Sequence, residues 1–262
     1  MPFEQLTLQS HEGITRLTLN RPELRNAMSP EMGHEMSAAV SEINSAPGTR
    51  VVIVSGAGKA FSAGGNLKSL ASETGVDSDA PGLGGGLKFY KLFLSVRQLE
   101  VPTIAAINGH AIGAGLCLAL ACDMRVIHER AKVGMTFTRL GIHPGMAATW
   151  TLPRLAGSAR AAELLFTGRV IDAQEAYRMG LVNRIAGEDF DEVVDGLAAE
   201  VAAAAPLAVR SVKRSLAASE RCDLEAALER EASAQAETFT TEDAREGLAA
   251  VLEKRDPRFT GR

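Results

Sequence analysis

The stretch INGHAIGAGLCLALACDMRV, Ile107–Val126, places three glycines before an unbroken apolar run. The run predicts a short buried helix, and Gly113 and Gly115 lie where a preceding strand passes into it. The first N–H groups of a helix have no partner inside the helix and carry the positive end of its dipole. Because the side chains here are small, an oxygen that bears negative charge could approach the backbone itself. Close packing of the helix on a strand is the alternative explanation for the glycines.

Short apolar segments on both sides of this stretch predict further strands. Segments 3–9 and 14–20 alternate apolar and polar residues with a period of two, which predicts a hairpin. Segments 51–56, 103–108 and 123–128 are rich in apolar residues and predict buried strands. Since helical patterns separate these strands, their order predicts an α/β fold with crossover connections.

Capping signals mark the predicted helices. Ser29 followed by Pro30 is typical of an N-cap and first helical turn. A further helix is predicted over 87–100. It follows a glycine-rich segment, 73–86, which predicts a surface loop. Beyond Pro144 the helical patterns dominate, so the C-terminal part of the chain is predicted to be largely helical.

The composition is that of an ordinary soluble globular protein. A formal net charge of -4, without long blocks of Lys or Arg, argues against a nucleic-acid partner. The three cysteines lack metal-ligand spacing, so we expect no metal site, and they fit a reduced, cytoplasmic protein. We expect no secretory signal, and the longest apolar run is too short to span a membrane.

A second glycine turn occurs in AFSAGGNLKSL, residues 60–70. Gly64 and Gly65 end a predicted strand in a loop that requires a free backbone. The N–H of Gly65 could therefore meet an N–H from the start of the buried helix at one oxygen atom. Two such donors in an apolar setting can stabilise an oxyanion.

Six segments together carry a resemblance to a known family. They are RPELRNAM (21–28), GKAFSAGGNLKSL (58–70), INGHAIGAGLCLALACD (107–123), AKVGMTFTRLGIHPG (131–145), the long segment 152–185, and EGLAAVLEKRDPRF (246–259). In this order and spacing the chain resembles the enoyl-CoA hydratase/isomerase family, also called the crotonase family. The resemblance covers nearly the whole chain.

The resemblance implies a fold, an assembly and a substrate class. The fold would be α/β, a crotonase-like spiral of ββα turns with a C-terminal helical oligomerisation region. We place the boundary at Ala186, with the spiral core in 1–186 and the trimerisation region in 187–262. The assembly would be a homotrimer or a dimer of trimers. The substrate would be an acyl-CoA thioester, as in fatty acid metabolism, with no other tightly bound cofactor.

The resemblance also implies roles for particular residues. The backbone N–H groups of Gly65 and Ala114 would form an oxyanion hole for the thioester carbonyl. The implied coenzyme A contacts are Arg25, Asn26 and Ala27 at the adenine, Lys68 at the phosphates, and Lys254 and Phe259 reaching the coenzyme A of a neighbouring copy.

The chain departs from the family at two positions. Hydratases of this family use two glutamates, and ungapped counting places Cys117 and Phe137 at those positions. Hydration needs a base for the water and an acid for the α-carbon, which a thiol and a phenyl ring do not supply. We therefore expect no efficient hydration, and we expect Cys117→Glu with Phe137→Glu to confer or raise it.

Three other groups, and Cys117 itself, are candidates for the acid or base. Tyr90 lies on a helix from which some family members supply a catalytic residue, although a ring packed under the loop is the simpler interpretation. Thr136 could position a water or an anion, or serve only as a strand residue. His143 could act as a base near neutral pH or cap its loop. Cys117 could act as an acid or a nucleophile, or be a buried apolar thiol.

Two functional hypotheses follow from these residues. The first is an enzyme that stabilises a thioester enolate for hydratase, isomerase or related lyase chemistry. The second is a non-catalytic acyl-CoA-binding protein with the same fold. We favour the enzyme, because converging donors at Gly65 and Ala114 would otherwise have little purpose.

Overall fold

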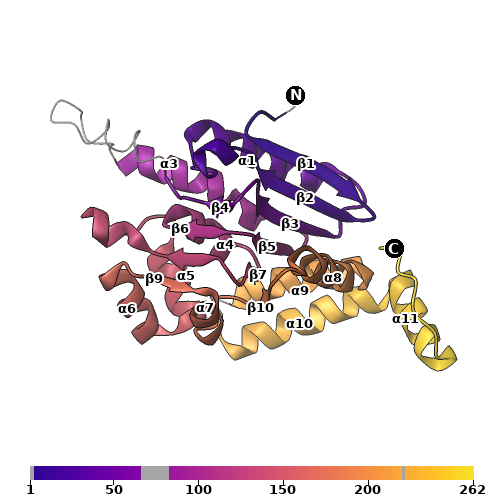
Figure 1. The fold of residues 1–262 in the computed structure, drawn as a ribbon. Coiled ribbons are helices and arrows are strands. Elements are labelled where there is room, and N and C mark those ends of the chain that lie inside the picture. Colours follow the sequence, from indigo (N-terminus) through magenta and orange to yellow (C-terminus); the bar gives the residue numbers. More distant parts are fainter. Residues whose placement is uncertain (1–2, 66–82, 220–221) are drawn as a thin grey trace.

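The computed structural model describes residues 3–65, 83–219 and 222–262. The larger sheet has the strand order β1-β2-β3-β5-β7-β10 (Figure 1). Its strands are β1 (Leu6–His11), β2 (Ile14–Leu19), β3 (Val51–Gly56), β5 (Thr103–Ile107), β7 (Met124–His128) and β10 (Arg184–Ala186). β1 and β2 form the predicted antiparallel hairpin, and the other neighbours in this sheet pair in parallel. The predicted α/β fold is therefore confirmed.

A second, smaller sheet has the order β4-β6-β8-β9. Its strands are β4 (Ala60–Ser62), β6 (His110–Ile112), β8 (Lys132–Gly134) and β9 (Val170–Asp172), each three residues long. β4, β6 and β8 pair in parallel, and β9 pairs with β8 antiparallel. The turns that contain Gly64 and Gly113 follow β4 and β6, so this sheet brings both turns to one place.

Helices and 3-10 turns connect and cover the strands (Figure 1). They are η1 (Pro22–Leu24), α1 (Pro30–Ser45), α3 (Leu83–Leu94), η2 (Ser95–Gln98), α4 (Ala114–Ala121), η3 (Thr136–Leu140), α5 (Ala148–Ala156), α6 (Ser158–Thr167), α7 (Ala173–Arg178), α8 (Phe190–Ala203), α9 (Pro206–Ser219), α10 (Leu224–Phe239) and α11 (Glu242–Glu253). The hydroxyl of Ser29 accepts a hydrogen bond from the Met32 N–H at 3.2 Å, which confirms the predicted cap of α1.

The glycine-rich loop was predicted four residues too long. Residues 66–82 of that region lie outside the described part, but α3 begins at Leu83 rather than at Leu87. Glycine costs about 1 kcal/mol in a helix relative to alanine. The three consecutive glycines before Leu87 therefore predict a loop. The helix forms nevertheless, because the packing of α3 on α1 outweighs the low helix propensity of glycine.

Helix α4 lies at the centre of the fold. All eight of its residues are buried, and it packs against β4, β5 and β6, which belong to both sheets. A helix that is apolar all round has no face for solvent, which explains the unbroken Ala/Leu run. The start of α4 is consequently held from all sides.

The C-terminal helices differ in how they join this core. Phe190, Val194 and Leu197 of α8 pack on the strands of the larger sheet, so α8 is part of the core although β10 ends at Ala186. The division into 1–186 and 187–262 stays a prediction. α11 lies at one end of the molecule, well away from α4 (Figure 1). Among the described residues, no helix is long and apolar enough to cross a bilayer.

Candidate active site

The first turn of α4 presents a backbone donor without an acceptor. Gly113 has φ +55°, a conformation that favours glycine, and its own N–H donates to the Gly134 carbonyl at 2.8 Å. The Gly113 carbonyl accepts from the Cys117 N–H at 3.1 Å and so starts the helix. Within the described structure the Ala114 N–H forms no hydrogen bond. This N–H is the donor that the sequence predicted at the helix start.

Two glycines allow the turn after β4 to lie directly against this donor. A Cβ on Gly115 would lie 2.5 Å from the Ser62 carbonyl oxygen, so α4 rests on β4 without a side chain between them. A Cβ on Gly64, whose φ is +88°, would lie 3.4 Å from the Ala114 nitrogen. The backbone beside Gly65 therefore touches the start of α4.

The hydrogen bonds of this turn leave the Gly65 N–H uncommitted. The Gly64 carbonyl accepts from the Met28 N–H at 2.8 Å, and the Gly64 N–H donates to the Ser62 hydroxyl at 3.1 Å. The Gly65 N–H forms no hydrogen bond with any described residue. Gly65 and Ala114 thus bring two free donors to one region, beside the positive end of α4, where an oxyanion would be favoured.

Phe137 and Thr136 lie at the same helix start. A Cβ on Gly113 would lie 3.8 Å from Phe137 Cζ and 3.9 Å from the Thr136 hydroxyl. Both side chains are half-buried, and the phenyl ring also packs against the main core. The structure therefore brings both predicted residues to Gly113, the residue before Ala114.

Cys117 lies one turn further along α4 and is closed off from solvent. Its thiol contacts the Met135 sulfur at 3.8 Å and donates to the Gly145 carbonyl at 3.7 Å. Burial raises the pKa of the Cys117 thiol to about 12. Burial therefore favours a neutral thiol and the alternative of a buried apolar side chain, and a role of Cys117 as a nucleophile or acid stays a prediction.

Tyr90 reaches the same region from α3. Its hydroxyl oxygen would lie 2.5 Å from a Cβ at Gly145, the residue whose carbonyl accepts from Cys117. His143, by contrast, is exposed, and its Nδ1 bonds to the Pro144 carbonyl at 2.8 Å. This places His143 in its own loop turn, as the alternative interpretation expected. Tyr90 stays a candidate.

The residues predicted to contact coenzyme A differ in how far they are buried. Asn26 is fully buried, and its side chain donates to the Ala57 and Ala60 carbonyls at 2.9 and 2.8 Å and accepts from the Arg21 N–H at 2.9 Å. Its amide group therefore holds the loop together, so the side chain has a structural role, and the implied place of Asn26 at the adenine stays a prediction. Arg25 is exposed beside it and Ala27 is half-buried, and Lys68 lies outside the described residues.

The C-terminal candidates are remote from the start of α4 within one chain. Lys254 is exposed at the end of α11, and Phe259 is half-buried against Gly247. The Phe259 carbonyl accepts from the Arg50 guanidinium at 2.7 Å, which fixes the tail on the core. α11 lies at one end of the molecule (Figure 1), and the implied contact of these two residues with the coenzyme A of a neighbouring copy stays a prediction.

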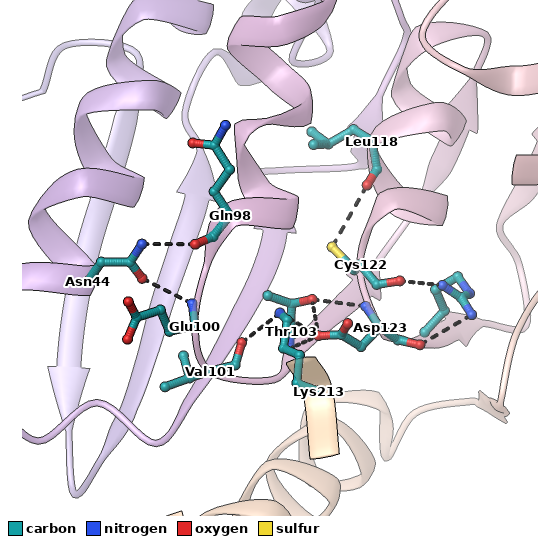
Figure 2. A network of polar contacts seen from close by, with 10 residues as sticks. Asn44, Gln98, Glu100, Val101, Thr103, Leu118, Cys122, Asp123 and Lys213 are labelled. Atoms are coloured by element: carbon teal, nitrogen blue, oxygen red, sulfur yellow. Dashed lines mark hydrogen bonds and ion pairs between the residues drawn. The ribbon is translucent and has the colours of Figure 1, made fainter. Parts of the chain in front are cut away.

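The opposite end of α4 is held by a polar network that includes Asp123 (Figure 2). Its carboxylate accepts from the Thr103 N–H at 2.7 Å, the Thr103 hydroxyl at 2.8 Å and the Lys213 ammonium at 2.8 Å. Lys213 also donates to the Val101 carbonyl at 2.8 Å. Asp123 therefore ties the end of α4 to β5 and α9.

Sequence reasoning missed two residues that shape the site. Ser62 braces the glycine turn through its hydroxyl, which also donates to the Asn26 carbonyl at 2.8 Å. Gly145 supplies the surface on which Tyr90 and Cys117 meet. The double glycine after Ser62 could have pointed to the first residue. For Gly145 the sequence gives no signal beyond its place after a proline.

These features define a class of protein: an α/β fold whose central buried helix and neighbouring glycine turn present free backbone donors for an oxyanion. The family model described as enoyl-CoA hydratase/isomerase matches residues 9–262. The chain belongs to the enoyl-CoA hydratase/isomerase family.

Individual relatives match this chain along nearly its whole length. The chain is 36% identical to the crotonyl-CoA hydratase of Syntrophomonas wolfei, over 99% of both chains. It is 34% identical to the short-chain-enoyl-CoA hydratase of Clostridium acetobutylicum, over 97% of both. The crystal structure of enoyl-CoA hydratase from Bacillus anthracis superposes with a TM-score of 0.93 at 37% identity, covering 99% of this chain and all of that one. The predicted crotonase-like fold is confirmed.

Proposed function

We propose that this chain is an enzyme that binds a short acyl-CoA thioester and stabilises its enolate with the N–H groups of Gly65 and Ala114. One observation carries the proposal. The Ala114 N–H is uncommitted at the start of a fully buried helix, and the Gly64 turn lies against it. When charge moves onto the thioester oxygen, two fixed donors in a dry setting lower the barrier. The names of the two curated relatives support a short 2-enoyl substrate.

The first test is a panel of saturated, 2-enoyl and 3-enoyl CoA thioesters, assayed for turnover, with binding measured by calorimetry in the same samples. Turnover of any member supports the enzyme. Tight binding without turnover would favour the non-catalytic acyl-CoA-binding alternative, for which the comparisons give no support. Absence of binding to every member would contradict both.

The missing carboxylates set an expectation for hydration. We propose that wild-type hydration of crotonyl-CoA is slow, because a neutral thiol and a phenyl ring occupy the positions implied for the two glutamates. Cys117→Glu with Phe137→Glu should raise the hydration rate by on the order of 100-fold, the usual contribution of a positioned acid or base. The matched control is Cys117→Gln with Phe137→Gln. A folded glutamate variant that hydrates no faster than this control would contradict the assignment of the two positions.

We further propose that the chain assembles as a homotrimer or a dimer of trimers. Large apolar side chains of the C-terminal helices are exposed, and a groove of about 550 Å³ lies between α5, α9 and the end of α4. Exposed apolar surface on this scale is typical of interfaces. Light scattering should give a trimer or hexamer mass, and Leu216→Glu in α9 should lower it, whereas Leu24→Glu in η1 should not. A monomer mass for the wild type would overturn the proposal.

A further inference from the structure

Ser62 is the last residue of β4, and it is completely buried beside the glycine turn. A serine hydroxyl can donate one hydrogen bond and accept others, and this one does both. It donates to the Asn26 carbonyl at 2.8 Å and accepts from the Gly64 N–H at 3.1 Å. The hydroxyl therefore joins two backbone segments that are distant in sequence, inside the protein.

The backbone of Arg25 and Met28 holds the same turn. The Ala63 N–H donates to the Arg25 carbonyl at 2.9 Å, and the Met28 N–H donates to the Gly64 carbonyl at 2.8 Å. The Gly64 carbonyl and the Gly65 N–H belong to one planar trans peptide unit, so they point in opposite directions. Because the carbonyl faces Met28, the Gly65 N–H is directed away from Met28.

The two consecutive glycines make the direction of this N–H easy to lose. Gly64 has φ +88°, and neither glycine has a side chain that would restrict its backbone. An oxyanion donor is most effective when it is fixed before the charge develops. Bonds on both sides of Gly64 fix it here, from Met28 at the carbonyl and to Ser62 at the N–H. Without the Ser62 hydroxyl, the buried Gly64 N–H would lose its acceptor and the peptide could rotate.

We propose that Ser62 is a positioning residue whose hydroxyl fixes Gly64 and so keeps the Gly65 N–H aimed at the oxyanion. This inference rests on the proposed function. The hydroxyl also lies against the helix that carries the other donor, since a Cβ on Gly115 would lie 2.8 Å from the Ser62 oxygen. Ser62 thus contacts both elements that present the donors, the turn after β4 and the first turn of α4.

Acetoacetyl-CoA measures the strength of the oxyanion site without a catalytic acid or base. The carbon between its two carbonyl groups loses a proton to solvent, and the resulting enolate, which absorbs ultraviolet light, carries negative charge on the thioester oxygen. Because this ionisation is an equilibrium, the midpoint of a pH titration of the bound thioester reports how well the protein stabilises the enolate. Wild type should ionise bound acetoacetyl-CoA at a lower pH than the free thioester.

Ser62→Ala removes only the hydroxyl oxygen. It should raise this midpoint by about one pH unit, a tenfold loss of enolate stabilisation, because the donor is loosened rather than removed. Binding of butyryl-CoA, whose carbonyl stays neutral, should change by less than about twofold, since hydrogen bonds to charged groups are the stronger ones. A merely structural role would lower the melting temperature and leave the midpoint unchanged.

The matched control is Ser95→Ala. Ser95 is 3% exposed, and its hydroxyl likewise donates to a backbone carbonyl, that of Leu92, at 2.6 Å. This variant loses a buried hydroxyl in η2 and should keep the wild-type midpoint. Thermal melting verifies that both variants are folded.

Two results would overturn the inference. They are a folded Ser62→Ala protein with the wild-type midpoint, and a Ser95→Ala protein whose midpoint rises as much as that of Ser62→Ala. A wild type that does not bind acetoacetyl-CoA, or that ionises it at the same pH as in solution, contradicts the proposed function itself. The two failures are distinguishable, because the first leaves the enolate stabilisation of the wild type in place.

Discussion

Ala114→Pro should lower kcat/KM for the best CoA thioester by about 100-fold or more while the protein keeps its fold. Proline removes the N–H, and loss of a single oxyanion donor typically costs a factor of about 100–1000. Ala114 is the first residue of α4, the one helical position where proline is well tolerated, and its N–H has no acceptor among the described residues. The substitution therefore removes a donor and leaves the hydrogen bonds of the helix intact.

The matched control is Ser158→Pro. Ser158 is likewise the first residue of a helix, α6, it follows a glycine with positive φ, and its side chain is exposed. This variant should keep wild-type turnover. Circular dichroism and thermal melting verify that both variants are folded, and Gly65→Pro tests the second donor in the same assay. Full activity in a folded Ala114→Pro protein would refute the oxyanion assignment.

The sequence predicted the parts of the fold that repeat over many residues. The hairpin of β1 and β2 and the long helix α1 show clear periods and a capping residue, and they occur as predicted. The second sheet was predicted only in part. Its strands β6, β8 and β9 are three residues long, which is too short for a periodic pattern to be recognised. Their pairing depends on long-range geometry that composition does not encode.

For the site, the sequence predicted backbone features better than side-chain roles. Glycines at turns indicate backbone N–H groups that are free to bind a ligand. Gly64, Gly113 and Gly115 do lie where β4 and α4 approach each other closely. Side-chain roles depend on partners distant in sequence. The Asn26 amide donates hydrogen bonds to carbonyls more than 30 residues away, and the Cys117 thiol donates to the Gly145 carbonyl. Neither contact can be inferred from spacing along the chain.

Arg125→Met should lower the free energy of unfolding by about 3 kcal/mol or more, the largest stability effect that we expect outside the site. The side chain is 5% exposed and lies on β7, directly after the end of α4. Its guanidinium donates to the Leu181 carbonyl at 2.7 Å and to the Cys122 carbonyl at 2.6 Å. Burial lowers the pKa of Arg125, although the group stays charged at neutral pH.

Methionine has a similar length but no donor, so the carbonyls would remain buried without partners, at about 1–3 kcal/mol for each. A melting temperature lower by roughly 6–12 °C follows for a chain of this size. The control is Arg130→Met, at an exposed arginine five residues further along, which should change stability by less than about 0.5 kcal/mol. If both variants melt like wild type, the guanidinium does not hold the end of α4. The buried helix that carries Ala114 would then owe its position to apolar packing and to the hydrogen bonds of Asp123.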